Sequence, residues 1–369
     1  MEWSFIHRDP NSYSSHPCVA LLDDGSWLVA FSSSRRQRPV RHPPDYPLLW
    51  NMVTRSTDRG RSWSAPEVVP GYDWLGVETP GITQISTGEV LLNQWRFHWY
   101  PLQLAREIHD ERGTECFVYD RMRRTWRPVV SASDWDDHPF PYVRADDGAY
   151  VHISHDRGRT FDATVAVDVA PYRGAFSPKG AVELSNRDLL LALGSHDHDP
   201  YGASLVVRSS DRGQTWGKPV EAARNEGRVF SEPALCETRS GKLLLMSREE
   251  ITGFVYQSES HDGGETWGEA TELPVWGYPS HCLSLQDGRL VVVYGYRKQP
   301  FGIRARISAD DGSTWGDEIV IRDDLSGAHD GWNLGYPSVI EYEPGQLFVA
   351  YYGEDGKGVT CILGSYLAV

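Results

Sequence analysis

The chain has 369 residues, of which 40% are hydrophobic and 24% are charged, as in ordinary soluble globular proteins. Its formal net charge of -15 argues against a nucleic-acid-binding surface, while a local basic pocket for an anion remains compatible with that charge. No stretch approaches the ~18 apolar residues of a membrane span, and 35 Gly, 23 Pro, 14 Trp and 18 Tyr indicate an all-β class with many turns between aromatic-rich strands.

The N-terminal residues indicate a strand and carry no targeting signal. Residues 2–7 are strand-like, and the segment from Met1 to Arg8 lacks the basic and apolar regions of a secretory signal. We therefore expect a cytoplasmic protein, or a secreted or periplasmic one if a signal peptide was removed before this sequence begins.

Five copies of one turn motif recur along the chain. They fit Ser-x-Asp-x-Gly-x-x-aromatic and read STDRGRSW at 56–63, SHDRGRTF at 154–161, SSDRGQTW at 209–216, SHDGGETW at 260–267 and SADDGSTW at 308–315. The Asp side chain can bond the turn amides, Gly permits a positive φ, and the aromatic residue anchors the turn. These Asp-box repeats predict the blades of a propeller, and we assign their Asp residues to folding rather than to catalysis.

A second repeat precedes the later Asp boxes. A Pro begins a strand, a Gly-containing turn follows, and an apolar strand returns, as after Glu232-Pro233, Tyr278-Pro279 and Tyr336-Pro337. Hairpins that alternate with box turns are what four-stranded blades require.

These repeats predict a single β-propeller domain over residues 1–369. The wide interval between the first two boxes indicates an insertion at about 97–148. We predict six blades, with seven as the alternative if His138-Pro139 begins one. Strand-like residues at both ends of the chain predict that the last blade closes by pairing of the N- and C-terminal strands, which protects their edges.

The residues that precede the repeated prolines predict a ligand site. The first strand of each blade lies nearest to the propeller axis, so His16, Glu232, Tyr278 and Tyr336 should converge at the mouth of the channel. The alternative is that these side chains only satisfy backbone groups at strand ends. Their polar and ionisable character favours a binding or catalytic site.

With its Asp boxes, its N-terminal strand from Phe5 to Pro10 and its later Glu, Arg, Arg and Tyr, nearly the whole chain resembles the sialidase (neuraminidase) family. The resemblance implies an exo-acting, retaining glycoside hydrolase that releases a terminal sialic acid or related 2-keto acid sugar from a glycoconjugate or oligosaccharide. It also implies three arginines for the substrate carboxylate, a Tyr nucleophile activated by a Glu, and an Asp acid/base. We expect no cofactor and no metal, because the arginines supply the positive charge and the tyrosine supplies the nucleophile.

The catalytic roles are carried over residue by residue. Tyr336 resembles the nucleophile, with Tyr278, in an almost identical local setting, as its competitor. Glu232 would take the phenolic proton, and Glu226 is the alternative. Asp45, in a loop rich in Arg, His and Pro before the first box, stands where the family carries its acid/base, and a simple turn role is its alternative.

Three arginines resemble the family's carboxylate-binding set. Arg8 ends the opening strand, although Asp9 stands where the family has an apolar residue. Arg248 follows Glu232 by 16 residues, across one hairpin. Arg304 immediately precedes the fifth Asp box, and Arg306 on the same strand face is its rival. Arginine suits this role better than lysine because its guanidinium can bind a carboxylate through two parallel hydrogen bonds.

Two other functions remain open from the sequence. One is a propeller glycosidase or polysaccharide lyase that acts on another acidic sugar with a histidine base, for which the candidates are His16, His42, His138, His196 and His198. The other is a non-catalytic carbohydrate-binding propeller that stacks sugars on Trp74, Trp95, Trp99 or Trp135. No metal site is expected, because the His196-Asp197-His198-Asp199 run has no further ligand fixed by sequence and the five cysteines show no CxxC spacing.

Overall fold

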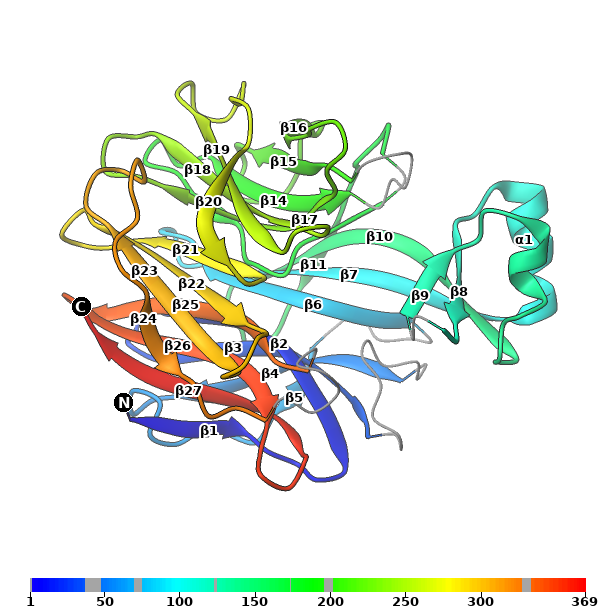
Figure 1. Cartoon of the computed structure of the whole chain (residues 1–369), viewed down its shortest axis with the longest axis horizontal. Helices are drawn as coiled ribbons and strands as arrows, with labels where there is room; N and C mark the ends of the chain where they lie inside the picture. The colour runs from blue at the N-terminus through cyan, green and yellow to red at the C-terminus, as the bar shows by residue number, and fades with distance from the viewer. Residues whose placement is uncertain are drawn as a thin grey trace.

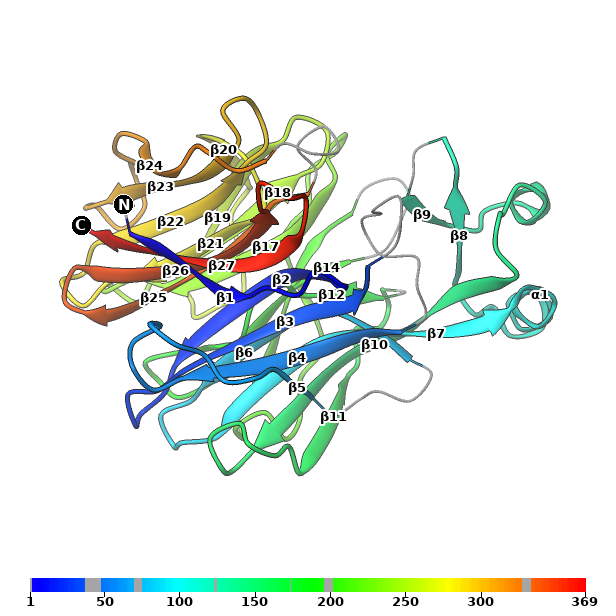
Figure 2. The same cartoon turned by 90° about the horizontal axis from the view of Figure 1, so that it is seen from below.

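The computed structural model describes residues 2–36, 48–69, 75–122, 125–172, 174–195, 202–326 and 333–369. Within these ranges, six antiparallel sheets follow one another around a central axis (Figures 1 and 2). This arrangement confirms the prediction of an all-β, six-bladed propeller.

The strands of the first three blades lie between residues 12 and 223. Blade 1 consists of β2 (Ser12–Leu21), β3 (Trp27–Arg35), β4 (Leu49–Ser56) and β5 (Glu67–Val68). Blade 2 consists of β6 (Leu75–Gln84), β7 (Val90–Pro101), β8 (Cys116–Asp120), β9 (Thr125–Pro128), β10 (Tyr142–Ser154) and β11 (Ala163–Val167). Blade 3 consists of β12 (Ala175–Phe176), β13 (Val182–Glu183), β14 (Leu189–Ser195), β15 (Ser204–Ser209) and β16 (Val220–Ala223).

The last three blades have four strands each. Blade 4 consists of β17 (Phe230–Glu237), β18 (Leu243–Glu249), β19 (Phe254–Ser260) and β20 (Thr271–Trp276). Blade 5 consists of β21 (Ser280–Ser284), β22 (Leu290–Tyr296), β23 (Gly302–Ser308) and β24 (Ile319–Arg322). Blade 6 consists of β25 (Gly335–Glu343), β26 (Gln346–Glu354), β27 (Thr360–Ala368) and β1 (Trp3–His7).

The ring closes through the two ends of the chain. Strand β1 pairs antiparallel with β27, with Phe5 opposite Leu363, and the two termini lie close together in Figure 1. The inner strand of blade 6, β25, packs against β2 of blade 1 and β21 of blade 5. The predicted pairing of the N- and C-terminal strands is therefore confirmed.

A lobe projects from blade 2 at one side of the propeller (Figures 1 and 2). The long strands β7 and β10 pair along their length and lead to helix α1 (Leu102–Arg112), strands β8 and β9, and the short 3-10 helix η1 (Ala132–Trp135). Neither helix in the described ranges has the length and apolar composition of a membrane span. The lobe falls within the range where the sequence indicates an insertion, while the single-domain organisation stays a prediction.

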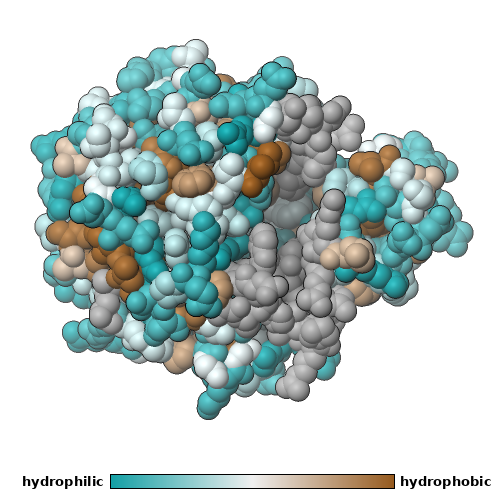
Figure 3. Space-filling view, viewed as in Figure 1, coloured by the Kyte–Doolittle hydropathy of each residue, from teal (hydrophilic) through white to brown (hydrophobic). Residues whose placement is uncertain are grey.

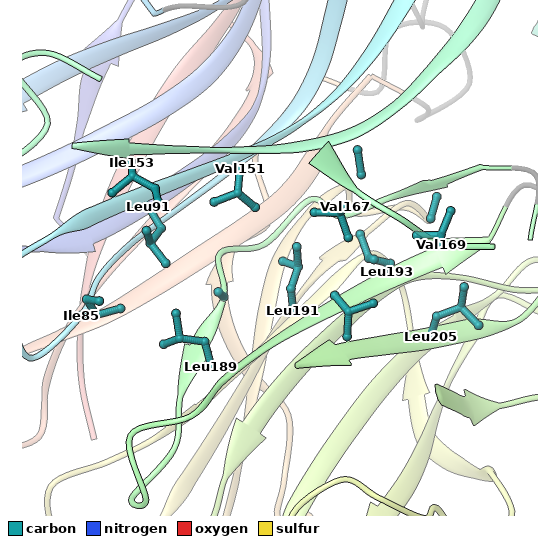
Figure 4. Packing of buried hydrophobic residues seen from close by; sticks show 14 of the residues in the cluster. Ile85, Leu91, Val151, Ile153, Val167, Val169, Leu189, Leu191, Leu193 and Leu205 are labelled. Atoms are coloured by element: carbon teal, nitrogen blue, oxygen red, sulfur yellow. The ribbon is translucent and has the colours of Figure 1, made fainter. Parts of the chain in front are cut away.

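The hydrophobic core lies between the blades. Between blades 2 and 3, Val151 and Ile153 of β10 pack with Leu191 of β14 and Leu205 of β15 (Figure 4). Leu191 is fully buried, so truncating it to alanine should cost about 2–5 kcal/mol. The face in Figure 3 is largely hydrophilic with scattered hydrophobic residues, because the alternating strands direct their apolar side chains toward neighbouring blades.

The Asp boxes form the turns that the sequence predicts. In the first box, Oδ1 of Asp58 accepts hydrogen bonds from the Ser62 amide and the Ser56 hydroxyl, both at 2.8 Å. Gly60 has a φ of +79°, and a Cβ there would lie 2.7 Å from the ring of Trp27. The same side-chain bonds recur at Asp156, Asp211, Asp262 and Asp310. These Asp residues therefore stabilise turns.

Candidate active site

A strained backbone feature recurs on the inner strands of four blades. His16, Thr79, Glu232 and Tyr336 each precede a proline and each have a left-handed φ between 46° and 54°. A β-bulge interrupts the strand register at each of these positions. This conformation is disfavoured for a non-glycine residue and more so before proline, and it costs on the order of 1–3 kcal/mol. Strain of this kind is concentrated at functional sites, where the surrounding structure holds it in place.

Tyr336 and Glu232 meet in the interior. The Tyr336 hydroxyl donates a hydrogen bond to Oε1 of Glu232, and both residues are buried. Burial raises the pKa of Tyr336 well above 10, and the Glu232 charge adds to this effect, while nearby guanidinium groups oppose it. The phenol is therefore neutral at physiological pH, with a proton acceptor already in hydrogen-bond contact.

Glu232 is the acceptor in its ionised form. Burial alone raises the pKa of Glu232, but the charge and hydrogen bond of Arg248, the Tyr336 hydrogen bond and Arg297 together outweigh burial and lower it. Nη1 of Arg248 lies 2.7 Å from Oε2 of Glu232. The carboxylate thus receives one bond on each oxygen and can accept the phenolic proton.

Arg248 joins two carboxylates and an aromatic ring. Its Nη2 lies 2.8 Å from Oε2 of Glu250, and its guanidinium carbon lies 4.0 Å from the ring centroid of Tyr278. Burial raises the pKa of Glu250, although Arg248 opposes that shift. Tyr278 therefore provides a stacking surface for a cation, whereas the Tyr336 hydroxyl contacts a carboxylate.

Arg297 is a further cation of this cluster that the sequence analysis missed. Its guanidinium carbon lies 5.1 Å from the ring centroid of Tyr278 and 5.9 Å from that of Tyr336, and its Nε donates to the Leu334 carbonyl at 3.0 Å. It directly follows β22, the second strand of blade 5, while Arg248 is the last residue but one of β18, the second strand of blade 4. The similar position of the two arginines in successive hairpins was the sequence signal that could have identified Arg297.

Aromatic and imidazole rings enclose the nucleophile candidate. The ring centroid of His16 lies 4.2 Å from that of Tyr336, edge to face, and the ring of Tyr352 lies at 5.9 Å. Burial, together with the charges of Arg297 and Lys179, lowers the pKa of His16 to about 3. His16 is therefore neutral at physiological pH and does not add a positive charge beside Tyr336.

The other two predicted arginines, Arg8 and Arg304, form contacts with groups outside the Tyr336–Glu232 pair. Nε and Nη2 of Arg8 contact Oδ2 of Asp355 at 2.7 and 2.6 Å, beside the turn between β26 and β27. Arg304 is buried within blade 5, where it donates to the carbonyls of Arg322 and Pro300 and lies 3.4 Å from Glu318. Arg248 is thus the predicted arginine that contacts Glu232, and the assignment of Arg8 and Arg304 to carboxylate binding stays a prediction.

The alternative residues named from the sequence, Arg306 and Glu226, contact other parts of the protein than Tyr336, Glu232 and Arg248. Arg306 donates to the Gly316 carbonyl at 2.6 Å, in the turn of the fifth Asp box. Glu226 is exposed and lies in a cleft of about 700 Å³ together with Arg224, Arg228 and Trp267. Glu232 is consequently the glutamate that contacts Tyr336.

Several other candidates pack in the lobe or lie outside the described residues. Trp95, Trp99 and Trp135 are buried, and Nδ1 of His138 accepts a hydrogen bond from the Tyr119 amide at 2.9 Å. Within the described ranges, no group of three His, Cys, Asp or Glu side chains is arranged to hold a metal ion. The predicted acid/base Asp45 lies outside the described residues, as do His42, Trp74, His196 and His198.

Comparisons with known proteins agree with this architecture. Residues 130–349 match the family model of the BNR repeat-like domain. A sialidase from Paraclostridium sordellii is 27% identical over 210 residues, 47% of this chain and 52% of that protein, and one from Micromonospora viridifaciens is 24% identical over 327 residues, 81% of this chain and 44% of that protein. The chain thus spans about half the length of these relatives.

Solved structures share the fold at low sequence identity. A protein of unknown function from Dyadobacter fermentans superposes with a TM-score of 0.83 at 22% identity, over 100% of this chain and 98% of that chain. A sialidase from Streptococcus pneumoniae superposes with a TM-score of 0.67 at 14% identity, over 100% and 70%, and an intramolecular trans-sialidase from Ruminococcus gnavus with 0.64 at 16%, over 99% and 96%. These likenesses concern the fold. Together with the family match, they show that the chain belongs to the BNR repeat-like family of the sialidase superfamily.

Proposed function

We propose that the chain is an exo-acting, retaining glycoside hydrolase of sialidase type that releases a terminal sialic acid or a related 2-keto acid sugar. The observation that carries this proposal is the buried hydrogen bond from the Tyr336 hydroxyl to the ionised Glu232. A carbohydrate-binding propeller needs cations and aromatic rings, but it does not need a phenol paired with a base.

Arg248 and Arg297 would hold the substrate carboxylate in this proposal. Both guanidinium groups lie against the ring of Tyr278, and Arg297 also lies over the ring of Tyr336. A carboxylate bound between them would place the anomeric carbon, to which it is attached, next to the phenol. Charge-assisted hydrogen bonds in a buried site supply both affinity and orientation.

The neutral phenol suits a substrate that carries its own negative charge. A carboxylate nucleophile, which most retaining glycosidases use, would meet electrostatic repulsion from a carboxylate on the anomeric carbon. Tyr336 can approach uncharged and transfer its proton to Glu232 as its oxygen bonds to that carbon. Because the nucleophile ionises only during attack, the repulsion in the ground state is avoided.

The reaction then proceeds by two displacements. In the first, the Tyr336 oxygen bonds to the anomeric carbon, Glu232 takes the phenolic proton, and the glycosidic bond breaks as the predicted acid Asp45 protonates the leaving oxygen. In the second, Asp45 takes a proton from water, the water oxygen attacks the anomeric carbon, and Glu232 returns its proton to the departing Tyr336 oxygen. Two inversions give net retention of configuration.

A substrate screen with stereochemical readout tests this proposal. Fluorogenic sialosides and ulosonosides would be assayed with the wild-type protein, and the first product anomer would be followed by NMR on an active substrate. We expect turnover of at least one terminal 2-keto acid glycoside with initial release of the retained anomer. Initial release of the inverted anomer, or no turnover across the panel, would overturn the proposal.

A further inference from the structure

A lysine crosses the propeller axis just behind the Tyr336 backbone. Lys179 lies between β12 and β13 of blade 3, and its Nζ donates a 2.7 Å hydrogen bond to the Pro337 carbonyl on β25 of blade 6. Blades 3 and 6 are opposite each other in a ring of six, so this bond spans the channel. The side chain is only 3% exposed.

The ammonium group is surrounded by ionisable groups from other blades. In the part of the chain that the structure describes, its charge interacts with Cys18 and His16 of β2, Glu232 of β17 and His281 of β21. Burial lowers the pKa of Lys179 to about 8, although Cys18 and Glu232 oppose the shift. Burial and the Lys179 charge together lower the pKa of His281 to about 3. Lys179 is therefore a cation flanked by neutral imidazoles.

A buried ammonium group is costly for folding. Moving a charge out of water carries a desolvation penalty of several kcal/mol, which the hydrogen bond to the Pro337 carbonyl offsets only in part. A methionine would fill a similar volume without that penalty. The position of this charge therefore indicates a role other than stabilising the fold.

The peptide that Lys179 binds belongs to the strained turn of Tyr336. Tyr336 has a φ of +49° and is followed directly by Pro337, whose carbonyl receives the ammonium bond. The next residues are tied to other blades: the Ser338 hydroxyl accepts from the Val19 amide at 3.1 Å, and the Val339 amide donates to Nδ1 of His281 at 3.0 Å. Lys179 supplies the one charge-assisted bond among these three, and such bonds are about twice as strong as neutral ones.

We propose that Lys179 is a positioning residue that fixes the strained Tyr336-Pro337 backbone, so that the phenol stays directed at Glu232. This inference rests on the proposed function, because it assigns Lys179 to the geometry of that nucleophile. Lys179 acts through the Pro337 carbonyl and does not touch substrate.

Three lysine variants test the proposal by steady-state kinetics and thermal unfolding. Lys179→Met removes both charge and donor, and Lys179→Gln keeps a neutral donor. Lys242→Met is the matched control, because Lys242 pairs with Glu259 at 3.0 Å on blade 4, away from Tyr336. We expect kcat to fall at least tenfold in Lys179→Met with KM within about twofold, a smaller fall in Lys179→Gln, and an unchanged kcat in the control. The Tm of Lys179→Met should equal or exceed that of the wild type.

Crystal structures of the wild type and Lys179→Met separate this inference from the proposed function. The inference predicts that the φ of Tyr336 and its contact with Glu232 change in Lys179→Met whether or not any sialoside is hydrolysed. An unchanged Tyr336 geometry, or a variant with full kcat, would overturn the role of Lys179. Loss of Tm together with an unchanged kcat would assign Lys179 to stability alone and overturn it as well. Absence of wild-type turnover with a changed Tyr336 geometry would refute only the function.

Discussion

Glu232 is held from two sides: Oε1 accepts the hydrogen bond of the Tyr336 hydroxyl, and Oε2 lies 2.7 Å from Nη1 of Arg248. The arginine keeps the carboxylate ionised despite its burial, and the phenol remains protonated because burial raises its pKa. The pair therefore rests in the protonation states from which the proposed attack begins.

Removing the Tyr336 hydroxyl should abolish the covalent route. Tyr336→Phe keeps the ring contacts with His16 and Tyr352 but lacks the nucleophilic oxygen. We expect kcat to fall on the order of 10³-fold or more, with a Tm close to that of the wild type. Steady-state kinetics and thermal unfolding of purified protein measure both quantities.

Tyr278→Phe is the matched control for that variant. The contacts of Tyr278 with Arg248 and Arg297 are made by its ring, which phenylalanine retains. We expect kcat within about threefold of the wild type, since cation–π contacts depend on the ring face. A loss in Tyr278→Phe as large as that in Tyr336→Phe would reopen the choice of nucleophile.

Replacing the base by its amide should slow the reaction without dismantling the site. Glu232→Gln can still accept the phenolic hydrogen bond but cannot take the proton. We expect kcat to fall about 10²- to 10⁴-fold while KM changes little. Full activity of Glu232→Gln in a kinetic assay would contradict a base role, and Glu226→Gln, at an exposed position, should behave like the wild type.

The two arginines of blade 5 should respond differently to the same conservative change. Arg297→Lys should raise KM for an acidic sugar about tenfold to a hundredfold, because lysine cannot form two parallel bonds to a carboxylate. Arg304→Lys should instead lower the free energy of unfolding by about 1–3 kcal/mol, because Arg304 satisfies buried carbonyls of its own blade. A raised KM in Arg304→Lys alone would support the sequence-based assignment of Arg304 to carboxylate binding.

Three histidines with lowered pKa values should make the protein lose stability on mild acidification. Burial lowers the pKa values of His16 and His281 to about 3 and that of His152 to about 4, whereas the unfolded chain titrates near 6.5. The contribution of these neutral histidines to the free energy of unfolding is therefore present above about pH 6.5. It is lost as the pH falls toward 4, by up to about 1.4 kcal/mol per pH unit for each histidine. Urea unfolding at pH 7, 6 and 5 measures the slope.

His281→Asn isolates one of these contributions. The asparagine oxygen can replace Nδ1 as acceptor for the Val339 amide, but it does not titrate. The slope of the unfolding free energy against pH should decrease by the amount that corresponds to the uptake of about one proton on unfolding. An unchanged slope would show that His281 does not remain neutral in the folded state.

The fold could be predicted from the repeats because the residues of each Asp box determine the conformation of their own turn. The bonds around Asp58 are local, spanning four residues, so a sequence pattern determines them. The pairing of β1 with β27 was predictable for a related reason, since an open propeller would leave two strand edges exposed. The structure of the lobe between β7 and β10 follows no repeat, and the sequence indicated only its approximate position.

The site was predictable where its residues occupy repeat positions. Glu232 and Tyr336 both precede a proline on an inner strand, and Arg248 lies near the end of the hairpin whose first strand carries Glu232. Arg297 was not predicted because it lies just after β22 rather than within it, and proximity to an Asp box favoured Arg304 instead. Lys179 was not predicted because its partner, the Pro337 carbonyl, is 158 residues away in the sequence. A local sequence pattern does not indicate a bond across the propeller axis.

Trapping the glycosyl-enzyme intermediate tests the central claim most directly. The protein would be incubated with a fluorinated analogue of an active 2-keto acid sugar, which slows hydrolysis of the intermediate, and then analysed by intact-mass and peptide mass spectrometry. We predict one covalent sugar per chain, attached to Tyr336 and absent from Tyr336→Phe. A label on any other residue, or full labelling of Tyr336→Phe, would contradict the assignment of Tyr336 as nucleophile.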